Sequence, residues 1–334
     1  GRGDGPGTAR RGDRGGRAGT RGRAPSVHNS QPWRWRVGDE RASVRRPEPA
    51  AAAHRPGPAR SDAQLRCGAA TFHRRALGVG LAVRGAPLPQ PADPDHLASI
   101  EILDSAVDEQ DIALAAAIPR RRTDRRWFSS WPVPGGDIAV MAARAARSGC
   151  CCAASRTRGD LAAVVARAVR EHISDPEYLA ELAMWSGRHG SPAGVPARNT
   201  RRRSNRAGSR PGSSPTRCSI SRPASRPATT PGGAGAGHRH RRPARAAGGR
   251  EATGAVLLTA TALGLASCPL TEPLELADTR DEVRAKLLDG DGFPQMLLRI
   301  GWAALNADPL PATPRRPLSE VAVRLDGSAL QTQN

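Results

Sequence analysis

A proline-bounded turn and an arginine-rich run hold the side chains best suited to binding chemistry. The string Pro-Ser-Val-His-Asn-Ser-Gln-Pro-Trp at 25–33 places short hydroxyl, amide and imidazole groups between two prolines. The run Arg-Arg-Arg-Thr-Asp-Arg-Arg-Trp-Phe at 120–128 adds a hydroxyl and several guanidinium groups. Because a guanidinium can donate two parallel hydrogen bonds to a phosphate, this run could bind a phosphorylated ligand. Without a ligand, the string at 25–33 would be an ordinary turn that caps a strand, and the run at 120–128 would be a basic turn exposed to solvent.

A second candidate phosphate site lies near the C-terminus. Arg315 and Arg316 directly precede Pro317, and proline is favoured at the first position of a helix. We therefore expect a closing helix from Pro317 through Leu325. Unpaired N–H groups and the dipole at a helix N-terminus attract anions. The two arginines are thus predicted to stand where a phosphate binds.

Hydrophobic periodicity indicates the elements that must position these residues. Trp33, Trp35 and Val37 alternate with arginines, which is the period of a half-buried strand. The segment that begins at Glu251 is apolar on nearly all faces, so a buried helix that ends before Pro269 is expected. Three further helices are expected, at 108–118, from Gly159 to Ile173, and from Pro176 to near Gly187, and a buried strand is expected at 296–302.

Four segments together resemble the nitroreductase family, and the block at 24–37 is similar to its Acg-type branch. The string at 25–33 resembles the flavin-binding turn, and 120–128 resembles an Arg-Arg-Ser-x-Arg-x-Phe motif with Thr123 in place of the commoner serine. The helix from Glu251 with its Gly-Leu-Ala-Ser-Cys exit and the Pro-Arg-Arg-Pro-Leu string at 314–318 follow in family order. The resemblance implies that FMN is bound by Ser26, His28, Asn29, Ser30, Gln31, Arg121, Arg122, Thr123, Arg125, Gly264, Leu265, Arg315 and Arg316.

The resemblance also implies an architecture. The fold would be α+β, with a nitroreductase-like sheet flanked by helices and two fused halves that form an internal pseudo-dimer around one FMN. The first half would span 24–118 and the second 119–326, followed by a tail at 327–334. Such a chain would act as a monomer.

The implied activity is the transfer of electrons from NAD(P)H through FMN to a small aromatic acceptor, a nitro compound or a quinone. The cofactor carries this chemistry, so no catalytic residue is assigned. The flavin of the Acg-type branch is thought to be covered by a lid segment. A catalytically silent flavin storage or sequestration protein is therefore a serious alternative.

Charge and composition add a third alternative and several expected absences. The net charge of +20 and the pI near 11.5 favour nucleic-acid binding, but a single lysine and 3% aromatic residues oppose it. The longest apolar run, 255–266, is shorter than the roughly 20 residues of a membrane span. The six cysteines lack CxxC spacing and are interpreted as incidental thiols. We expect a cytoplasmic protein with no metal site, and we attribute the pair His238 and His240 to chance.

Arg/Pro/Gly-rich stretches interrupt the chain at 1–23, 41–66, about 147–158 and 201–250. They hold too few apolar residues to form a core, so we expect them to be irregular or disordered. A hypothesis for their abrupt edges is that they are translated out of the ancestral reading frame, and the alternative is a genuine basic insert. We expect these interruptions to weaken FMN binding or folding.

Overall fold

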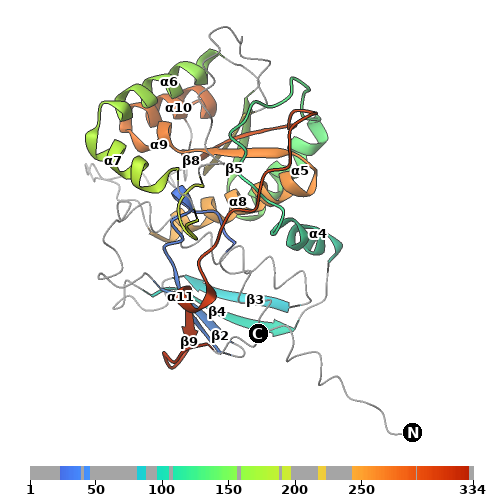
Figure 1. Cartoon of the computed structure of the whole chain (residues 1–334). Helices are drawn as coiled ribbons and strands as arrows, with labels where there is room; N and C mark the ends of the chain where they lie inside the picture. Colours follow the sequence, from blue (N-terminus) through green and yellow to red (C-terminus); the bar gives the residue numbers. More distant parts are fainter. Residues whose placement is uncertain are drawn as a thin grey trace, which may run out of the picture. The chain divides into compact units, whose positions relative to one another are not determined.

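The computed structural model divides into two compact units (Figure 1). Unit 1 comprises Gly1–Arg121, Met184–Thr200 and Ala312–Asn334, and unit 2 comprises Arg122–Ala183 and Arg201–Pro311. The structure describes residues 23–38, 41–45, 81–87, 96–104, 108–155, 159–187, 190–196, 217–222, 243–290 and 292–330. The stretch at 1–22 and the pair His238 and His240 lie outside these residues. The C-terminal segment belongs to unit 1, whereas the sequence-based division placed it with residues 119–326.

Unit 1 is built on a five-stranded sheet with the order β3-β4-β2-β1-β9. Its strands are β1 (Arg34–Val37), β2 (Arg41–Arg45), β3 (Leu81–Pro87), β4 (His96–Asp104) and β9 (Ala322–Arg324). β1 pairs antiparallel with β2 and parallel with β9. The expectation that 41–66 is irregular was wrong for 41–45, because β2 pairs through its backbone with β1 on one side and β4 on the other. Residues 46–66 lie outside the described residues.

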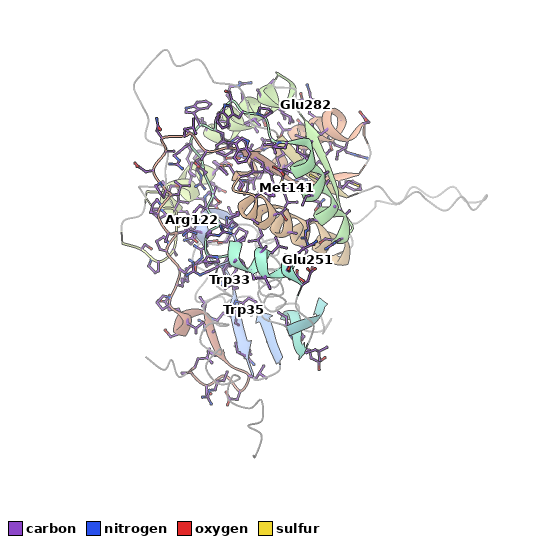
Figure 2. The ribbon with its side chains drawn as sticks, turned by 90° about the vertical axis from the view of Figure 1, so that its right-hand side faces the viewer. Trp33, Trp35, Arg122, Met141, Glu251 and Glu282 are labelled. Carbon is purple, nitrogen blue, oxygen red and sulfur yellow. The ribbon has the colours of Figure 1, made fainter. Side chains whose placement is uncertain are left out.

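The core of unit 1 forms around two tryptophans of the first strand region (Figure 2). Trp33 is 2% exposed and Trp35 is fully buried, and both pack with Ile100 and Val321. Arg34 and the next arginine of the strand are exposed. The alternation expected from the sequence is confirmed.

The described residues of unit 1 also form the short helical elements η1 (Val27–Asn29), α4 (Glu109–Ala117) and α11 (Leu318–Val321). α4 begins as expected, with the Asp108 side chain accepting a hydrogen bond from the N–H of Gln110. The closing helix expected through Leu325 was wrong, because α11 is only four residues long. The backbone then extends at Ala322, where β9 pairs with β1.

Unit 2 is built on a four-stranded sheet with the order β5-β6-β8-β7. Its strands are β5 (Cys151–Ser155), β6 (Arg217–Arg222), β7 (Ala266–Leu270) and β8 (Phe293–Gly301). The helices within its described residues are α5 (Gly135–Arg147), α6 (Gly159–Ile173), α7 (Pro176–Trp185, whose last two residues belong to unit 1), α8 (Pro243–Ala262), α9 (Glu272–Glu275) and α10 (Ala277–Leu288).

Two hydrophobic clusters in unit 2 meet alternate residues of β8. Leu298 and Ile300 pack with α5 and the buried part of α8, around Met141 and Leu257 (Figure 2). Leu297 instead packs with α6, α9 and α10, which lie side by side in Figure 1. Because successive strand residues point to opposite faces, helices cover both faces of this sheet.

Two stretches that were expected to be irregular contain strands of this sheet. β5 lies within 147–158, and β6 lies within 201–250 between β5 and β8. The first residues of α8 also fall in the latter stretch. Strand pairing uses backbone N–H and C=O groups, so a sequence poor in apolar residues can form a strand between two paired neighbours. The expectation was therefore wrong for these segments.

The helices of unit 2 otherwise begin and end close to where the sequence places them. On α6, Leu161, Val164 and Ala168 are buried as expected, whereas Ile173 is exposed. Asp175 caps α7, since its Oδ1 accepts from the N–H groups of the second and third helical residues. The strand expected at 296–302 is confirmed as β8, which begins three residues earlier.

The described residues also bear on two expectations, that the chain has no membrane span and that its cysteines are incidental thiols. Across the described ranges, every helix is too short or too polar to cross a membrane. Among the described residues, the thiols of Cys150, Cys151 and Cys268 are not part of a disulfide. Cys152 is disulfide-bonded, so the expectation of incidental thiols was wrong for this residue.

Candidate functional site

The turn at 26–31, here called the polar turn, holds an unusual backbone conformation. His28, Asn29 and Gln31 have φ values of 50°, 54° and 51°, in the left-handed region that favours glycine. Among the other described residues that are not glycine, only Asp289 has a positive φ. Such strain persists only where the surroundings fix it, and it clusters at functional sites.

Asn29 fixes the polar turn to two other segments of unit 1. Its Nδ2 donates to the carbonyl oxygens of Gly194 and Pro314, both at 3.1 Å. Its Oδ1 accepts a hydrogen bond from Nη1 of Arg315 at 3.0 Å. The side chain is 9% exposed, and both of its N–H donors are used within the protein.

Gln31 ties the turn to the same two segments. Its Oε1 accepts from the backbone N–H of Arg316 at 3.0 Å, and its Nε2 donates to the carbonyl oxygens of Pro192 at 2.8 Å and Asn29 at 3.3 Å. The side chain is 3% exposed. Asn29 and Gln31 thus position the turn and the C-terminal segment, which is a different role from direct contact with a ligand.

The other members of the polar turn are closed by local hydrogen bonds. Ser26 Oγ accepts from the N–H of Gln31 at 3.1 Å, and Ser30 Oγ donates to the carbonyl of Val27 at 2.9 Å. His28 is partly exposed. The sequence therefore placed the polar residues in one turn correctly, but it did not reveal the partners at 192–194, which lie more than 160 positions away.

Arg315 and Arg316 lie beside the polar turn but differ in what they contact. Arg315 Nη1 donates to Asn29 Oδ1, to the carbonyl of Pro314 at 2.9 Å and to that of Thr313 at 3.3 Å. The Nε of Arg316 is buried and has no hydrogen-bond partner within the described part of the chain. Its Nη1 lies 3.9 Å from Glu320. The expected reason for an anion site here, a helix dipole, was wrong because α11 is a single short turn.

The second set of expected residues lies mainly in unit 2, in what we call the arginine segment (122–128). Thr123 forms a parallel bridge with Ser267, and the N–H of Asp124 donates to the carbonyl of Ser267 at 2.9 Å. Arg122 Nε donates to the carbonyl of Pro311 at 3.2 Å. Arg125 is exposed. Arg121 is buried and belongs to unit 1, where its N–H donates to the carbonyl of residue 117 at 2.9 Å.

A buried carboxylate organises the arginine segment from within. Asp124 is 4% exposed, and its Oδ1 accepts from the backbone N–H and the Nε of Arg126 at 2.9 and 3.0 Å. Its Oδ2 accepts from Arg126 Nη2 at 2.9 Å. Arg126 also donates from Nη1 to the carbonyl of Asp308 at 2.7 Å. This ion pair was not expected, because a charge run alone does not say which members pair.

Arg299 of β8 is a further residue that sequence reasoning missed. Its Nη2 donates to the carbonyl oxygens of Asp124 at 3.1 Å and Arg126 at 2.8 Å. Its guanidinium carbon lies 4.2 Å from the centre of the Phe128 ring, within the range of a cation–π interaction. The signal that could have revealed it is the position of one charged residue inside an otherwise uncharged, largely buried strand.

Gly264 and Leu265 have structural roles at the end of α8. The N–H of Leu265 donates to the carbonyl of Ala260 and that of Gly264 to Thr261, the pattern of a Schellman motif. Gly264 has φ +78°, which a side chain would strain. Leu265 is 4% exposed and packs in the core of unit 2. Beyond this turn, burial raises the pKa of the Cys268 thiol, although the charges of Arg299 and Arg125 lower it.

The arrangement offers hydrogen-bond donors and positive charge rather than metal ligands. No group of three or more His, Cys, Asp or Glu side chains within the described residues could hold a metal ion. Guanidinium groups with free or exposed donors are present at Arg125 and Arg316. Such donors suit a phosphate or another anionic, oxygen-rich ligand.

Comparison with known proteins gives relatives that cover most of the chain. No model of a protein family matches it. It is 48% identical over 305 residues to "Putative NAD(P)H nitroreductase Rv3131" of Mycobacterium tuberculosis, covering 90% of this chain and 88% of the relative. It is 33% identical over 315 residues to "Putative NAD(P)H nitroreductase acg" of the same organism, covering 90% and 92%.

The solved structures that resemble this chain have lower sequence identity to it. A nitroreductase with bound FMN from Bacteroides fragilis is 15% identical, with a TM-score of 0.39, and covers 60% of this chain and 93% of its own. The FMN-dependent nitroreductase NfnB from Mycobacterium smegmatis in complex with NADPH is 18% identical, with a TM-score of 0.35, and covers 64% and 97%.

Proposed function

This chain belongs to the NAD(P)H nitroreductase family of its two mycobacterial relatives, as its sequence motifs predicted, and from this premise we propose that it is an FMN-dependent oxidoreductase. In this proposal it takes electrons from NADH or NADPH and passes them to a small aromatic acceptor, a nitro compound or a quinone. The support is the family membership together with the donor groups of the polar turn region and of the arginine segment.

The observation that carries the proposal is the position of the Arg316 guanidinium beside the polar turn. The Nη1 of Arg315 donates to Asn29 and to neighbouring carbonyls, and these bonds hold the segment before α11 in place. Arg316 is held through its backbone N–H by Gln31, while its buried Nε has no partner among the described residues. A partly buried guanidinium with an unused donor suits an anion such as the FMN phosphate.

Within unit 2, the arginine segment offers donors of the same chemical kind. Arg122 and Arg125 supply positive charge and Thr123 supplies a hydroxyl, which suit the phosphate, ribityl or pyrimidine oxygens of FMN. The buried Asp124 neutralises Arg126, so this acidic side chain does not compete for the remaining arginines. We therefore propose Arg316 in unit 1, and separately Arg122, Thr123 and Arg125 in unit 2, as FMN-binding residues. Within unit 1, Asn29, Gln31 and Arg315 position the polar turn and the segment that carries Arg316.

The reaction needs little from the side chains beyond binding and orientation. When bound, FMN supplies the redox chemistry, since its isoalloxazine ring can accept a hydride and return electrons. The guanidinium groups neutralise the phosphate, and the strained, fully hydrogen-bonded polar turn offers a rigid surface. No side chain is required as an acid or base, so we assign no catalytic residue.

A titration with matched variants tests the proposed FMN site. Purified protein is titrated with FMN and binding is followed by quenching of flavin fluorescence. We expect Arg316→Gln to weaken binding by roughly tenfold or more, the effect of losing a hydrogen bond from a charged group. Arg324→Gln, which removes an exposed arginine of the same unit, should leave binding unchanged. Equal affinity of both variants and the wild type would contradict the assignment of Arg316, and absence of any FMN binding would contradict the function.

A further inference from the structure

Arg299 is a charged residue at a costly position. It lies on β8 between Leu298 and Ile300, which are both fully buried. Placing a guanidinium in such a strand costs free energy unless its donors find acceptors. The contacts of Arg299 therefore indicate what the strand gains from the charge.

Those contacts lie on either side of Arg125, the exposed arginine of the arginine segment. The two carbonyl groups that Arg299 Nη2 binds belong to Asp124 and Arg126, the residues immediately before and after Arg125. The Phe128 ring beneath the guanidinium adds a third point of attachment. One side chain of β8 thus fixes the backbone on both sides of Arg125.

Within the described residues, no acidic side chain forms an ion pair with Arg299. The Asp124 carboxylate is occupied by three donors of Arg126, so it does not serve as the partner of Arg299. The Nη2 of Arg299 instead donates to two carbonyl oxygens and its guanidinium lies over the Phe128 ring, whereas its buried Nε has no hydrogen-bond partner among the described residues.

We infer that Arg299 is a positioning residue, which holds the arginine segment so that Arg122, Thr123 and Arg125 can bind the anionic and oxygen-rich parts of FMN. The inference rests on the proposed function for its ligand. It assigns to β8 a residue that acts through the segment and does not need to touch FMN itself.

Arg299→Met is the variant that tests the inference, and Arg284→Met is its matched control. Arg284 also lies over an aromatic ring, that of Phe293 at 5.0 Å, but on α10. Hydrogen exchange of the FMN-free protein is measured by mass spectrometry on peptides that cover 122–128. We expect Arg299→Met to raise the exchange rate there roughly tenfold, because the backbone loses its anchor, and Arg284→Met to leave it unchanged.

FMN affinity distinguishes a residue that positions the arginine segment from one that only stabilises the fold. We expect Arg299→Met to weaken FMN binding roughly tenfold, beyond any effect of Arg284→Met. Arg299→Lys, which keeps the charge and can donate to one carbonyl, should recover part of the affinity. If Arg299→Met fails to fold, Phe128→Leu removes the ring without altering β8, and it should raise exchange in the same peptides.

The outcomes separate this inference from the function it rests on. If wild-type protein binds FMN and the two methionine variants match it in affinity and exchange, Arg299 is not a positioning residue and the proposed function stands. If wild-type protein does not bind FMN, the proposed function fails together with the ligand named here. In that case the exchange rates alone decide whether Arg299 holds the segment.

Discussion

Arg315 donates a hydrogen bond from Nη1 to Oδ1 of Asn29 at 3.0 Å, across 286 positions of sequence. The bond joins the segment before α11 to the strained polar turn near the start of the described chain. Because Asn29 also donates to Gly194 and Pro314, a single amide connects three segments of unit 1. The polar turn is therefore a structural junction as well as a candidate cofactor site.

Removal of this amide should destabilise unit 1. Asn29→Ala leaves the carbonyl of Gly194 without its Asn29 donor and removes one of the hydrogen bonds of Pro314 and of Arg315, which still bond to each other. We expect a loss of about 2–3 kcal/mol in the free energy of unfolding. Urea unfolding followed by tryptophan fluorescence measures it. The control Ser328→Ala, at an exposed turn, should change stability by less than about 0.5 kcal/mol. A similarly small loss for Asn29→Ala would show that the junction is not stabilising.

The positive φ of His28 should make the polar turn sensitive to side-chain shape. A β-branched residue tolerates the left-handed region poorly, whereas glycine adopts it freely. We expect His28→Val to be less stable than His28→Gly by about 1–2 kcal/mol in the free energy of unfolding. Thermal unfolding of the two variants makes the comparison. Equal stability would mean that the backbone at residue 28 is not left-handed.

The buried carboxylate of Asp124 should stabilise the arginine segment. Asp124→Ala removes the acceptor of the Arg126 backbone N–H and of its side chain, and we expect a loss of about 1–2 kcal/mol, since part of the ion pair is solvent-exposed. Asp124→Asn keeps one acceptor and should lose less. The measurement is the urea midpoint of each variant, and Asp326→Ala, at an exposed carboxylate, is the control. If both Asp124 variants match this control, the carboxylate does not organise the segment.

The thiols should differ in reactivity with pH. Burial raises the pKa of Cys268, so less thiolate is present at mildly alkaline pH and alkylation should be slow. Cys151 is exposed and should be alkylated first. Mass spectrometry of tryptic peptides after iodoacetamide treatment without reductant reports the order. The Cys268 rate should rise only as pH passes its raised pKa, and equally fast labelling of both thiols would contradict the burial.

Local periodicity was sufficient to predict much of the framework. The alternation at Trp33 and Trp35, the start of a helix at Pro176 and the apolar character of α8 each concern neighbouring residues, and each is confirmed. Long-range contacts such as Arg299 with Asp124 join residues 175 positions apart. No local pattern specifies them, so the anchors of the candidate site emerged only from the fold.

Segments poor in apolar residues were underestimated for a different reason. β6 pairs through its backbone with β5 on one side and with β8 on the other, and amino-acid composition does not reveal this pairing. The hypothesis that 1–23, 41–66, about 147–158 and 201–250 are out of frame stays a prediction, although β2, β5 and β6 lie within three of these stretches. Resequencing the gene tests it, and a shifted frame without apolar periodicity across 201–250 would contradict it.

The most direct test of the proposed function is the visible spectrum of the purified protein after incubation with FMN, removal of free FMN and anaerobic addition of NADPH or NADH. The interrupting stretches were expected to weaken FMN binding or folding, but β2, β5 and β6 form within three of them. We therefore expect flavin bands that stay with the protein, bleach with the reduced nicotinamide and return on addition of a nitro compound or quinone. Bands that persist unbleached would contradict the oxidoreductase and favour flavin storage. A protein that retains no flavin at all would contradict FMN binding itself.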